Sequence, residues 1–373
     1  MRIILSGGGT GGHIYPALTI IRAIEKAVKS CDVLFVGTQK GLEADIIPKE
    51  GYDFTTIDVR GFERSFTFQN LATIFKTVGS VWESQSIIRN FKPDVVIGTG
   101  GYVCGPVLLA ASILGIPTLV QEQNVIPGVT NKILSRFVKK IALGYDDAAK
   151  HFSNQDKVIY TGNPIRSDVM SASREEGIQA LGLDFNKKTI LISGGSRGAR
   201  SINQAMIHVH QFFAGRKDVQ LLHVTGKNEY NGIVGNLQQR GIDFASAGNI
   251  SIKPYLYDMP YALAAADLAI FRAGAIGLAE LTARGIPSIL IPYPYAAENH
   301  QEFNALVMKN NGAAEVILDK ELSGEKLLTA VNSLIDDNSR LSSMALASKK
   351  LGRPQAADEI AQIVIGLSKI HNH

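Results

Sequence analysis

Residues 2–6 (RIILS) run directly into residues 7–13 (GGGTGGH), and this junction sets the architecture of the first half of the chain. A short apolar run that ends in glycines and leads into an amphipathic segment is typical of a buried parallel strand, a tight turn and a helix. The same succession returns at residues 189–193 (TILIS) and 194–200 (GGSRGAR). Two such openings predict two domains of similar architecture rather than a short-period repeat protein.

Apolar runs alternate with helical patterns through both halves. The helix after the first glycine turn is expected over residues 17–28, with Pro16 in its first turn. Further strands are expected at residues 33–36, 95–98, 118–121, 220–224, 268–271 and 288–292, and further helices at 275–284, 298–310, 321–336 and 357–368. The alternation predicts an α/β fold with an open, doubly wound parallel sheet in each half. Ligands of such sheets bind beyond the carboxyl ends of the strands, so we expect the site in a cleft between the two domains.

The domain boundary is expected at residues 161–166 (TGNPIR), where Gly, Asn and Pro interrupt regular structure. The predicted division is residues 1–163 for the first domain and 164–350 for the second. Residues 351–373 are expected to form a C-terminal helix that packs back onto the first domain.

Composition limits the class of protein. The chain has 373 residues, of which 45% are hydrophobic and 19% charged, proportions typical of globular domains. A net charge of +4 is too small to indicate nucleic acid as a partner. Cys31 and Cys104 do not have the spacing of a metal site, and two cysteines are too few for a disulfide framework, so both are expected to be reduced. No apolar stretch approaches the ~20 residues of a membrane span, which predicts a cytoplasmic chain with at most peripheral membrane contact.

The first glycine turn lets backbone N–H groups approach a phosphate or a sugar at a helix start. It fits the dinucleotide fingerprint GxGxxG poorly, and a tight turn without any ligand remains an alternative. His13 follows this turn. A histidine here fits a general base, a hydrogen-bond donor to a sugar, or a structural cap equally well.

The second glycine turn combines backbone donors with Ser196, Arg197 and Arg200, which suits a diphosphate. Arg166 can approach it from the linker, and a solvated surface charge is the alternative for the arginines. No Asp-x-Asp motif occurs, so helix starts and arginine, rather than an anchored metal, are expected to neutralise a leaving diphosphate.

Two later segments combine glycine or proline turns with polar helix starts. In residues 271–281 (FRAGAIGLAEL), Glu280 suits a ribose, whereas favourable interaction with the helix dipole is the alternative. In residues 292–305 (PYPYAAENHQEFNA), amides suit sugar hydroxyls because they both donate and accept, and a merely polar helix start is the alternative.

Seven segments in register resemble the MurG family of N-acetylglucosaminyltransferases: GGGTGGHIYPAL, GTGGYVCGP, EQNVIPGVTNK, TGNPIR, GGSRGARSIN, FRAGAIGLAEL and NHQEFNA. The resemblance covers essentially the whole chain and implies the GT-B fold, two Rossmann-like domains facing a cleft. It implies inverting transfer of N-acetylglucosamine from UDP to the 4-hydroxyl of undecaprenyl-diphosphate-linked N-acetylmuramoyl-pentapeptide (lipid I), giving lipid II for peptidoglycan. The first domain would bind lipid I and the second UDP-N-acetylglucosamine.

The resemblance also implies roles for individual residues. The expected UDP-N-acetylglucosamine contacts are Ser196 and Arg166 at the diphosphate, Glu280 at the ribose, the backbone amides of Ala275 and Ile276 at phosphate, the main chain of Leu256 at uracil, Gln301 at the sugar, and Thr10, Gly11, Gly12 and Asn124 from the first domain. The acceptor contacts are Gly100, Gly101 and Tyr102. His13 is the first candidate for the catalytic base and Glu122 the second. At Arg197 and His300 the family often has glutamine, which leaves their roles open. No cofactor and no metal ligand is expected, and the sequence does not imply stimulation by divalent ions.

A membrane partner is suggested by an apolar helical face that has basic residues in the same domain. The apolar residues are Ile74, Phe75, Val78, Val81 and Trp82, and the basic residues are Arg60, Arg64, Lys76, Arg89, Lys92, Lys132, Arg136, Lys139 and Lys140. Such a surface suits the cytoplasmic face of an anionic bacterial membrane, to which the protein would bind peripherally. An ordinary core face with solvated charges around it is the alternative.

Three other classes of protein compete with the transferase. A UDP-N-acetylglucosamine 2-epimerase would share the architecture but leave the GTGGYVCGP loop and the apolar face unexplained. A nicotinamide-dependent oxidoreductase disagrees with the poor dinucleotide fingerprint. A non-catalytic binding module would have no reason to keep site residues in both halves.

Overall fold

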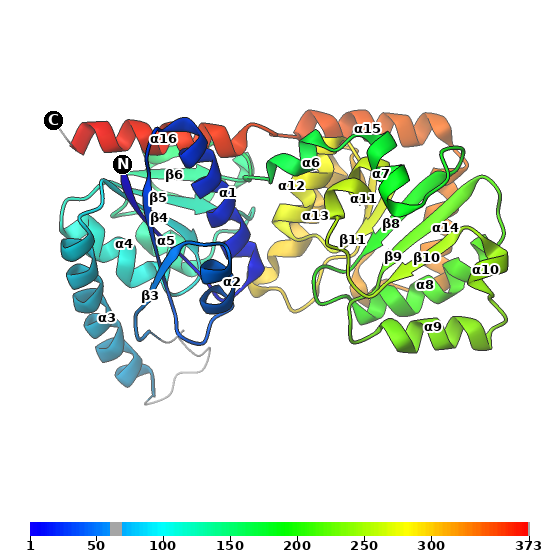
Figure 1. Ribbon diagram of the computed structural model, residues 1–373, viewed down its shortest axis with the longest axis horizontal. Helices are drawn as coiled ribbons and strands as arrows, with labels where there is room; N and C mark the ends of the chain where they lie inside the picture. Colours follow the sequence, from blue (N-terminus) through cyan, green and yellow to red (C-terminus); the bar gives the residue numbers. More distant parts are fainter. Residues whose placement is uncertain (60–68, 372–373) are drawn as a thin grey trace. The chain divides into compact units, whose positions relative to one another are not determined.

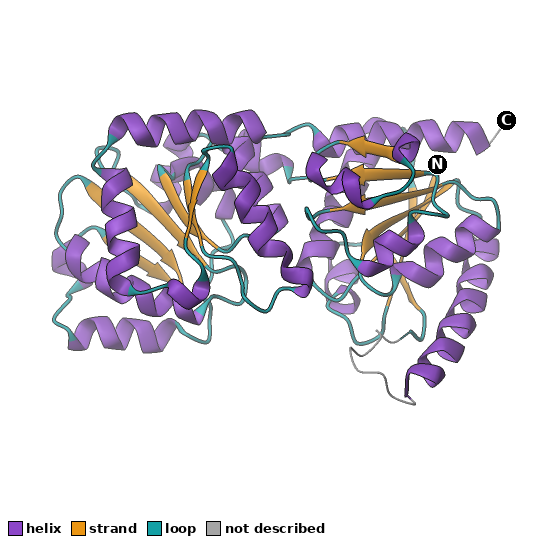
Figure 2. Ribbon diagram, turned by 180° about the vertical axis from the view of Figure 1, so that it is seen from behind, coloured by secondary structure: helices purple, strands orange, loops and turns teal. Residues whose placement is uncertain are grey.

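The computed structural model describes residues 1–59 and 69–371, with the backbone alone for residues 69–78, Ala245 and residues 370–371. The chain forms two compact units, Met1–Ile165 with Pro354–His373, and Arg166–Arg353. Each unit is a parallel sheet with helices on both faces (Figures 1 and 2). The predicted pair of doubly wound α/β domains is therefore confirmed.

Within the described residues, the first sheet has seven parallel strands in the order β3-β2-β1-β4-β5-β6-β7. The strands are β1 (Arg2–Gly7), β2 (Asp32–Gly37), β3 (Asp53–Thr56), β4 (Val95–Gly100), β5 (Thr118–Glu122), β6 (Lys140–Leu143) and β7 (Val158–Tyr160). The helices of this unit are α1 (Gly11–Ala27), α2 (Glu43–Lys49), α3 (Gln69–Phe91), α4 (Cys104–Ile113), α5 (Val129–Leu134) and α16 (Ala356–His371), with 3₁₀ turns η1 (Asp146–His151) and η2 (Gln155–Lys157).

Alternate residues of β1 supply the two faces of this sheet, as the two-residue period of a strand requires. Ile3 and Leu5 pack in a core with α1 and α16, whereas Ile4 packs in the core on the α4 side. α16 packs along α1, where Ile360 and Val364 are fully buried. The last segment of the chain therefore completes the first unit.

Within the described residues, the second sheet has six parallel strands in the order β10-β9-β8-β11-β12-β13. The strands are β8 (Lys188–Ser193), β9 (Val219–Val224), β10 (Ile250–Lys253), β11 (Leu268–Phe271), β12 (Ser288–Leu290) and β13 (Ala314–Val316). The helices are α6 (Ser167–Ser171), α7 (Arg174–Leu181), α8 (Arg200–Phe213), α9 (Tyr230–Gln239), α10 (Phe244–Ala247), α11 (Met259–Ala265), α12 (Ala275–Arg284), α13 (His300–Asn310), α14 (Gly324–Ile335) and α15 (Asn338–Leu351), with 3₁₀ turns η3 (Ala297–Asn299) and η4 (Asp319–Glu321).

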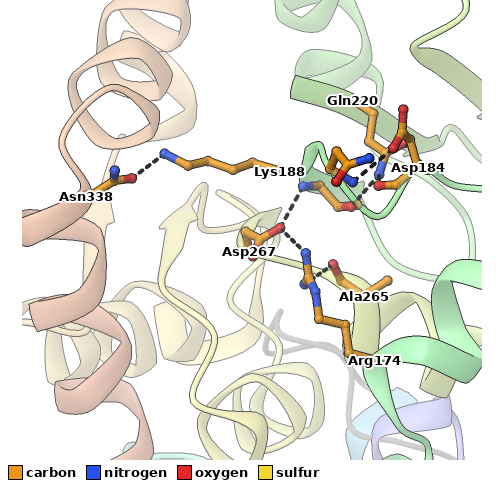
Figure 3. Close-up of polar contacts among 9 residues, drawn as sticks. Arg174, Asp184, Lys188, Gln220, Ala265, Asp267 and Asn338 are labelled. Atoms are coloured by element: carbon orange, nitrogen blue, oxygen red, sulfur yellow. Dashed lines mark hydrogen bonds and ion pairs between the residues drawn. The ribbon is translucent and has the colours of Figure 1, made fainter. Parts of the chain in front are cut away.

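A polar network fastens the amino ends of β8 and β11 (Figure 3). Asp267 Oδ2 accepts hydrogen bonds from Thr189 N at 2.7 Å and from Arg174 Nη2 at 2.9 Å. Lys188 Nζ donates to Asn338 Oδ1 at the start of α15. The network lies at the amino edge of the sheet, and the glycine turns follow the carboxyl ends of the strands at the opposite edge. The amino edge is therefore structural, and the site is expected at the carboxyl ends of the strands.

The first helix starts earlier than predicted. α1 begins at Gly11, so Pro16 lies inside the helix and not in its first turn. A proline there removes one backbone donor, whose acceptor would be the carbonyl of the exposed Gly12. Among the described residues, no helix is long and apolar enough to cross a membrane.

Candidate functional site

The two glycine motifs of the first unit lie against each other. Gly8 N donates to Gly100 O at 3.3 Å, which joins the turn after β1 to the end of β4. Gly100 and Gly101 have φ angles of +107° and +86°. A Cβ on Gly101 would lie 2.6 Å from Gly8 O, so the backbones meet at a distance that only glycine allows.

His13 is held at this junction in a defined tautomer. Its Nδ1 lies 2.9 Å from Thr99 O, a pure acceptor, so Nδ1 carries the proton. Burial lowers the pKa of His13, which keeps the ring neutral and leaves the lone pair on Nε2. The ring occupies the space that a side chain at position 100 would need, because a Cβ on Gly100 would lie 2.6 Å from Nδ1. Such a ring can take a proton at Nε2, which fits a base better than a donor to a sugar.

A buried amide network supports the carbonyl that holds His13. Gln123 Nε2 donates to Thr99 O at 2.6 Å. Asn163 Nδ2 donates to Gln123 O, and Gln121 Nε2 donates to Asn163 Oδ1, both at 2.9 Å. Sequence reasoning did not identify these amides, although four consecutive polar residues after an apolar run (VQEQN) were a visible signal.

Glu43 was also missed, and it anchors the first glycine turn. Its side chain is fully buried and accepts hydrogen bonds from Gly9 N at 3.0 Å and from Thr38 N and Oγ1 at 3.1 and 2.7 Å. The Gly9 N–H is thus already used by a carboxylate. Donors for a ligand remain at Gly11 and Gly12, because first-turn N–H groups of a helix have no intrahelical partner.

Glu122 is fully engaged with its own loop. Oε1 accepts from Asn124 N at 2.9 Å and Asn124 Nδ2 at 3.4 Å, and Oε2 accepts from Gly128 N at 3.1 Å and Asn131 Nδ2 at 2.8 Å. These four donors use the four acceptor positions of a carboxylate. The geometry therefore favours a loop-holding role for Glu122 over the catalytic role considered for it, and it also ties down Asn124.

In the second unit, residues 194–200 form a closed turn at the start of α8. Gly198 N donates to Gly195 O at 2.9 Å, and both glycines have positive φ angles, +77° and +89°. Ser196 and Arg197 are exposed on this turn. The turn thus presents a hydroxyl and a guanidinium group to solvent at a helix start.

Glu280 and Arg166, predicted to contact ribose and diphosphate, form a pair. Arg166 Nη2 lies 3.6 Å from Glu280 Oε1, whose side chain is 12% exposed. Burial raises the pKa of Glu280 to about 7, although the guanidinium group favours the ionised form. Ala275 and Ile276 occupy the first turn of α12 and offer backbone N–H groups there.

Of the remaining predicted contacts, Gln301 lies in the first turn of α13 and Leu256 lies on a loop. Gln301 Oε1 accepts from Tyr293 N at 3.0 Å, and its NH₂ group carries further donors. Leu256 lies half-buried in the loop after β10. Arg272, whose role the sequence did not reveal, donates to Asp319 Oδ1 at 2.6 Å and to Ser201 Oγ at 2.8 Å, and so ties the end of β11 to α8.

Among the described side chains, no group of three or more His, Cys, Asp or Glu residues is placed to hold a metal ion. Of the apolar face expected to bind a membrane, the side chains of Val81 and Trp82 are described. Trp82 is 74% exposed, whereas Val81 is half-buried and packs against the core of the first unit. The side chains of Ile74, Phe75, Val78, Arg60, Arg64 and Lys76 lie outside the described part of the structure.

Comparison with known proteins places the chain in a family. Residues 3–143 match the glycosyltransferase family 28 N-terminal domain, and residues 189–360 match the family 28 C-terminal domain. A UDP-N-acetylglucosamine–N-acetylmuramyl-(pentapeptide) pyrophosphoryl-undecaprenol N-acetylglucosamine transferase of Desulforamulus reducens is 47% identical over 98% of both chains. Its counterpart in Bacillus cytotoxicus is 48% identical over 99% of this chain and 100% of its own. The chain belongs to the MurG family.

Solved structures agree with this assignment. The Acinetobacter baumannii MurG structure has a TM-score of 0.77 and 25% identity, over 98% of this chain and 99% of that one. A UDP-N-acetylglucosamine 2-epimerase from Neisseria meningitidis has a TM-score of 0.69 at 14% identity, over 98% of this chain and 100% of that one, which shows a shared fold alone. The MurG-family chain thus has the GT-B type of fold that the resemblance implied.

The two units of this MurG-family chain divide the predicted residues between them. The first unit carries Thr10, Gly11, Gly12, His13, Gly100, Gly101, Tyr102, Glu122 and Asn124. The second unit carries Arg166, Ser196, Leu256, Ala275, Ile276, Glu280 and Gln301. Within the first unit, the structure brings His13 and Gly100 into contact, and within the second it pairs Arg166 with Glu280.

Proposed function

We propose that this chain transfers N-acetylglucosamine from UDP to the 4-hydroxyl of lipid I, the acceptor that the names of its relatives describe. The observation that carries the proposal is the 47% identity to such transferases over nearly the whole chain. The epimerase alternative rests on a likeness of fold at 14% identity. The chain is a hexosyltransferase that acts in peptidoglycan synthesis.

The donor is assigned to the second unit. Glu280 accepts hydrogen bonds from the ribose hydroxyls. Arg166, which lies beside Glu280, contacts the diphosphate together with Ser196. The N–H groups of Ala275 and Ile276 meet the phosphates at the start of α12, where the helix dipole favours negative charge. Leu256 contacts uracil through its main chain, and Gln301 contacts the sugar.

The acceptor is assigned to the first unit, near Gly100, Gly101 and Tyr102. The acceptor oxygen attacks the anomeric carbon in line, the bond from that carbon to the diphosphate oxygen breaks, and UDP leaves with the bonding electrons. His13 Nε2 takes the proton of the acceptor hydroxyl, because its lone pair is kept available by the hydrogen bond from Nδ1 to Thr99 O. Thr10, Gly11, Gly12 and Asn124 contact the donor sugar from this unit.

The deciding experiment measures the product. Purified protein is incubated with UDP-N-acetylglucosamine labelled in the sugar, with and without lipid I. We expect label in the lipid fraction only when lipid I is present. Release of free N-acetylmannosamine or its UDP ester without a lipid acceptor would instead identify an epimerase.

Donor affinity should depend on pH through Glu280. Because the pKa of this carboxyl is about 7, it is protonated below that pH and then accepts fewer hydrogen bonds. If only the ionised form binds ribose, affinity for UDP-N-acetylglucosamine should rise roughly tenfold from about pH 6 to pH 8. Calorimetry measures this, and the sugar nucleotide suits it better than UDP, whose terminal phosphate itself titrates. Glu280→Gln should bind weakly at both pH values, and an unchanged pH dependence in that variant would assign the titration to another group.

We further propose that the first unit binds the cytoplasmic face of anionic membranes. A set of exposed apolar side chains lies on α3, α4 and α5 and on the turn after α5, where α3 contacts α4 and α4 contacts α5. They are Trp82, Ile113, Val129, Ile133 and Phe137, with exposed fractions of 74%, 61%, 59%, 58% and 51%. Arg136 and Lys139 are exposed beside Phe137 in the sequence. Apolar groups next to basic ones suit an anionic bilayer surface.

Trp82 is the single tryptophan of the chain and serves as the reporter. With phosphatidylglycerol vesicles at low salt, we expect its emission to shift to the blue, and the shift to shrink as salt screens the attraction. Phe137→Ser should weaken binding. Phe185→Ser should not, because Phe185 has a similar exposed fraction of 58% but lies in the second unit. Equal binding to neutral and anionic vesicles would refute the electrostatic part.

A further inference from the structure

Four buried polar groups form a chain between α8 and the end of β9. His210 Nε2 lies 3.0 Å from His223 Nδ1. His223 Nε2 lies 3.0 Å from Asn203 Oδ1, and Asn203 Nδ2 donates to Thr225 O at 2.9 Å. All four residues are 0% exposed. Nothing in the transfer chemistry uses these groups, yet burying them without partners would cost free energy.

The direction of every hydrogen bond in this chain follows from its last member. Thr225 O can only accept, so the Asn203 amide must turn its NH₂ group towards it and its Oδ1 towards His223. His223 Nε2 must then carry a proton, and His223 Nδ1 accepts one from His210 Nε2. Burial lowers the pKa of His210 to about 3 and that of His223 as well, so both rings are neutral and have one N–H each. Among the described residues, none forms a hydrogen bond with His210 Nδ1. Because the proton of His210 is on Nε2, this Nδ1 is an acceptor without a partner and not a buried N–H without one.

The chain ends directly beneath the second glycine turn. A Cβ on Gly198 would lie 2.0 Å from Thr225 O, and a Cβ on Gly226 would lie 2.5 Å from Arg197 O. The backbone of residues 197–198 is therefore seated on residues 225–226 without room for a side chain on either. A shift of Thr225 would have to move the turn that carries Ser196.

We propose that His223 is a positioning residue for the UDP-N-acetylglucosamine donor. Through Asn203 it fixes the carbonyl of Thr225, and with it the backbone on which the Ser196 turn closes. The proposal rests on the proposed function in one respect, since it takes residues 194–200 as part of the donor site. His223 itself does not touch the substrate.

Two polar replacements of His223 separate positioning from simple stability. The amide of glutamine lies as many bonds from Cβ as Nε2 does, so His223→Gln can still donate to Asn203 but no longer accepts from His210. The amide of asparagine matches Nδ1, so His223→Asn keeps His210 satisfied but cannot reach Asn203. Each variant leaves one buried polar group without its hydrogen-bond partner, so both variants should lose a similar amount of thermal stability.

Their donor affinities should nevertheless differ. By calorimetry with UDP-N-acetylglucosamine, we expect His223→Asn to bind at least about tenfold more weakly than wild type and His223→Gln within about threefold, since one lost buried hydrogen bond corresponds to roughly tenfold. The KM for donor should follow the same order, with little change in the KM for lipid I. Equal affinities in the two variants, or the reverse order, would overturn the proposal.

Two controls keep the result clear. Asn249 is a buried amide at the opposite edge of the same sheet, where it donates to Phe213 O and Val219 O at 2.8 Å. Asn249→Ala should lose stability and keep the donor affinity of wild type. In the wild-type protein, nitrogen NMR of the imidazoles should show His223 protonated at Nε2, and protonation at Nδ1 would overturn the proposal without any variant.

The proposed function can fail separately from this inference. A wild-type protein that binds UDP-N-acetylglucosamine but does not glycosylate lipid I would refute the transfer reaction, while the order of affinities in the two variants still tests His223. A wild-type protein that does not bind the sugar nucleotide at all would overturn both.

Discussion

We expect His13→Ala to lower kcat by about 10²–10⁴, the usual contribution of the positioned general base that we propose His13 to be, and to leave affinity for UDP-N-acetylglucosamine nearly unchanged. The structure gives the reason. The ring is neutral, its Nδ1 proton is committed to Thr99 O at 2.9 Å, and Nε2 is the only ring nitrogen left to accept a proton. Most residues that we assign to the donor belong to the second unit. Steady-state kinetics with saturating lipid I, together with donor calorimetry, measures both quantities.

His13→Asn separates the base from a positioning role. The asparagine amide can still donate to Thr99 O but cannot take a proton at neutral pH. We expect this variant to be as slow as His13→Ala, and near-normal kcat would mean that the base lies elsewhere. In the wild type, kcat should fall as the pH drops through the pKa of His13. That limb should lie below the ordinary pKa of histidine, because burial lowers it.

We expect Glu122→Gln to destabilise the first unit by roughly 2–4 kcal/mol, although the two side chains have nearly the same shape. Glutamine presents an NH₂ group where the carboxylate presents an oxygen, so two of the four donors now face another donor. If the NH₂ group takes the place of Oε2, the two donors that face it are Gly128 N and Asn131 Nδ2, which lie 3.1 and 2.8 Å from Oε2. Hydrogen exchange of residues 124–131, read by mass spectrometry, reports the local free energy of opening.

The matched control for this substitution is Glu25→Gln. Glu25 is exposed and accepts one hydrogen bond, from the Tyr52 hydroxyl at 2.9 Å. Its replacement should change stability by no more than about 0.5 kcal/mol. A Glu122→Gln protein that keeps its stability but loses turnover would restore Glu122 as a catalytic candidate.

The sheets and the glycine turns could be predicted from the sequence because their signals are local. A strand such as residues 2–6 is read from its own apolar run, and the turn after it from its own glycines. The short strands β3, β6, β7, β10 and β13 carry weaker patterns of three or four residues and were not predicted. The start of α1 was misplaced because Pro16 looked like a helix beginning, whereas the helix already starts at Gly11.

The partners of buried polar groups could not be predicted, because they are chosen by the tertiary fold. Glu43 reads as an ordinary acidic residue at a helix start, yet it is fully buried on Gly9, 34 positions away. Arg166 and Glu280 were assigned separate ligand contacts from motifs more than a hundred residues apart, and only the fold shows them as a pair. His223 belongs to no recognisable motif, and the role that we propose for it depends on its hydrogen bond to Asn203 and on the bond from Asn203 to Thr225.

The packing of α16 along α1 has a consequence for how the protein is made. The first unit needs residues 356–371 to cover its apolar flank, but the ribosome translates the entire second unit in between. At ~5–20 residues per second, that interval lasts roughly 10 to 40 s. The second unit is continuous in the chain and can mature as soon as it emerges. The order of completion is thus inverted: the domain that leaves the ribosome first is finished last, and the nascent chain carries an uncovered α1 through most of its synthesis.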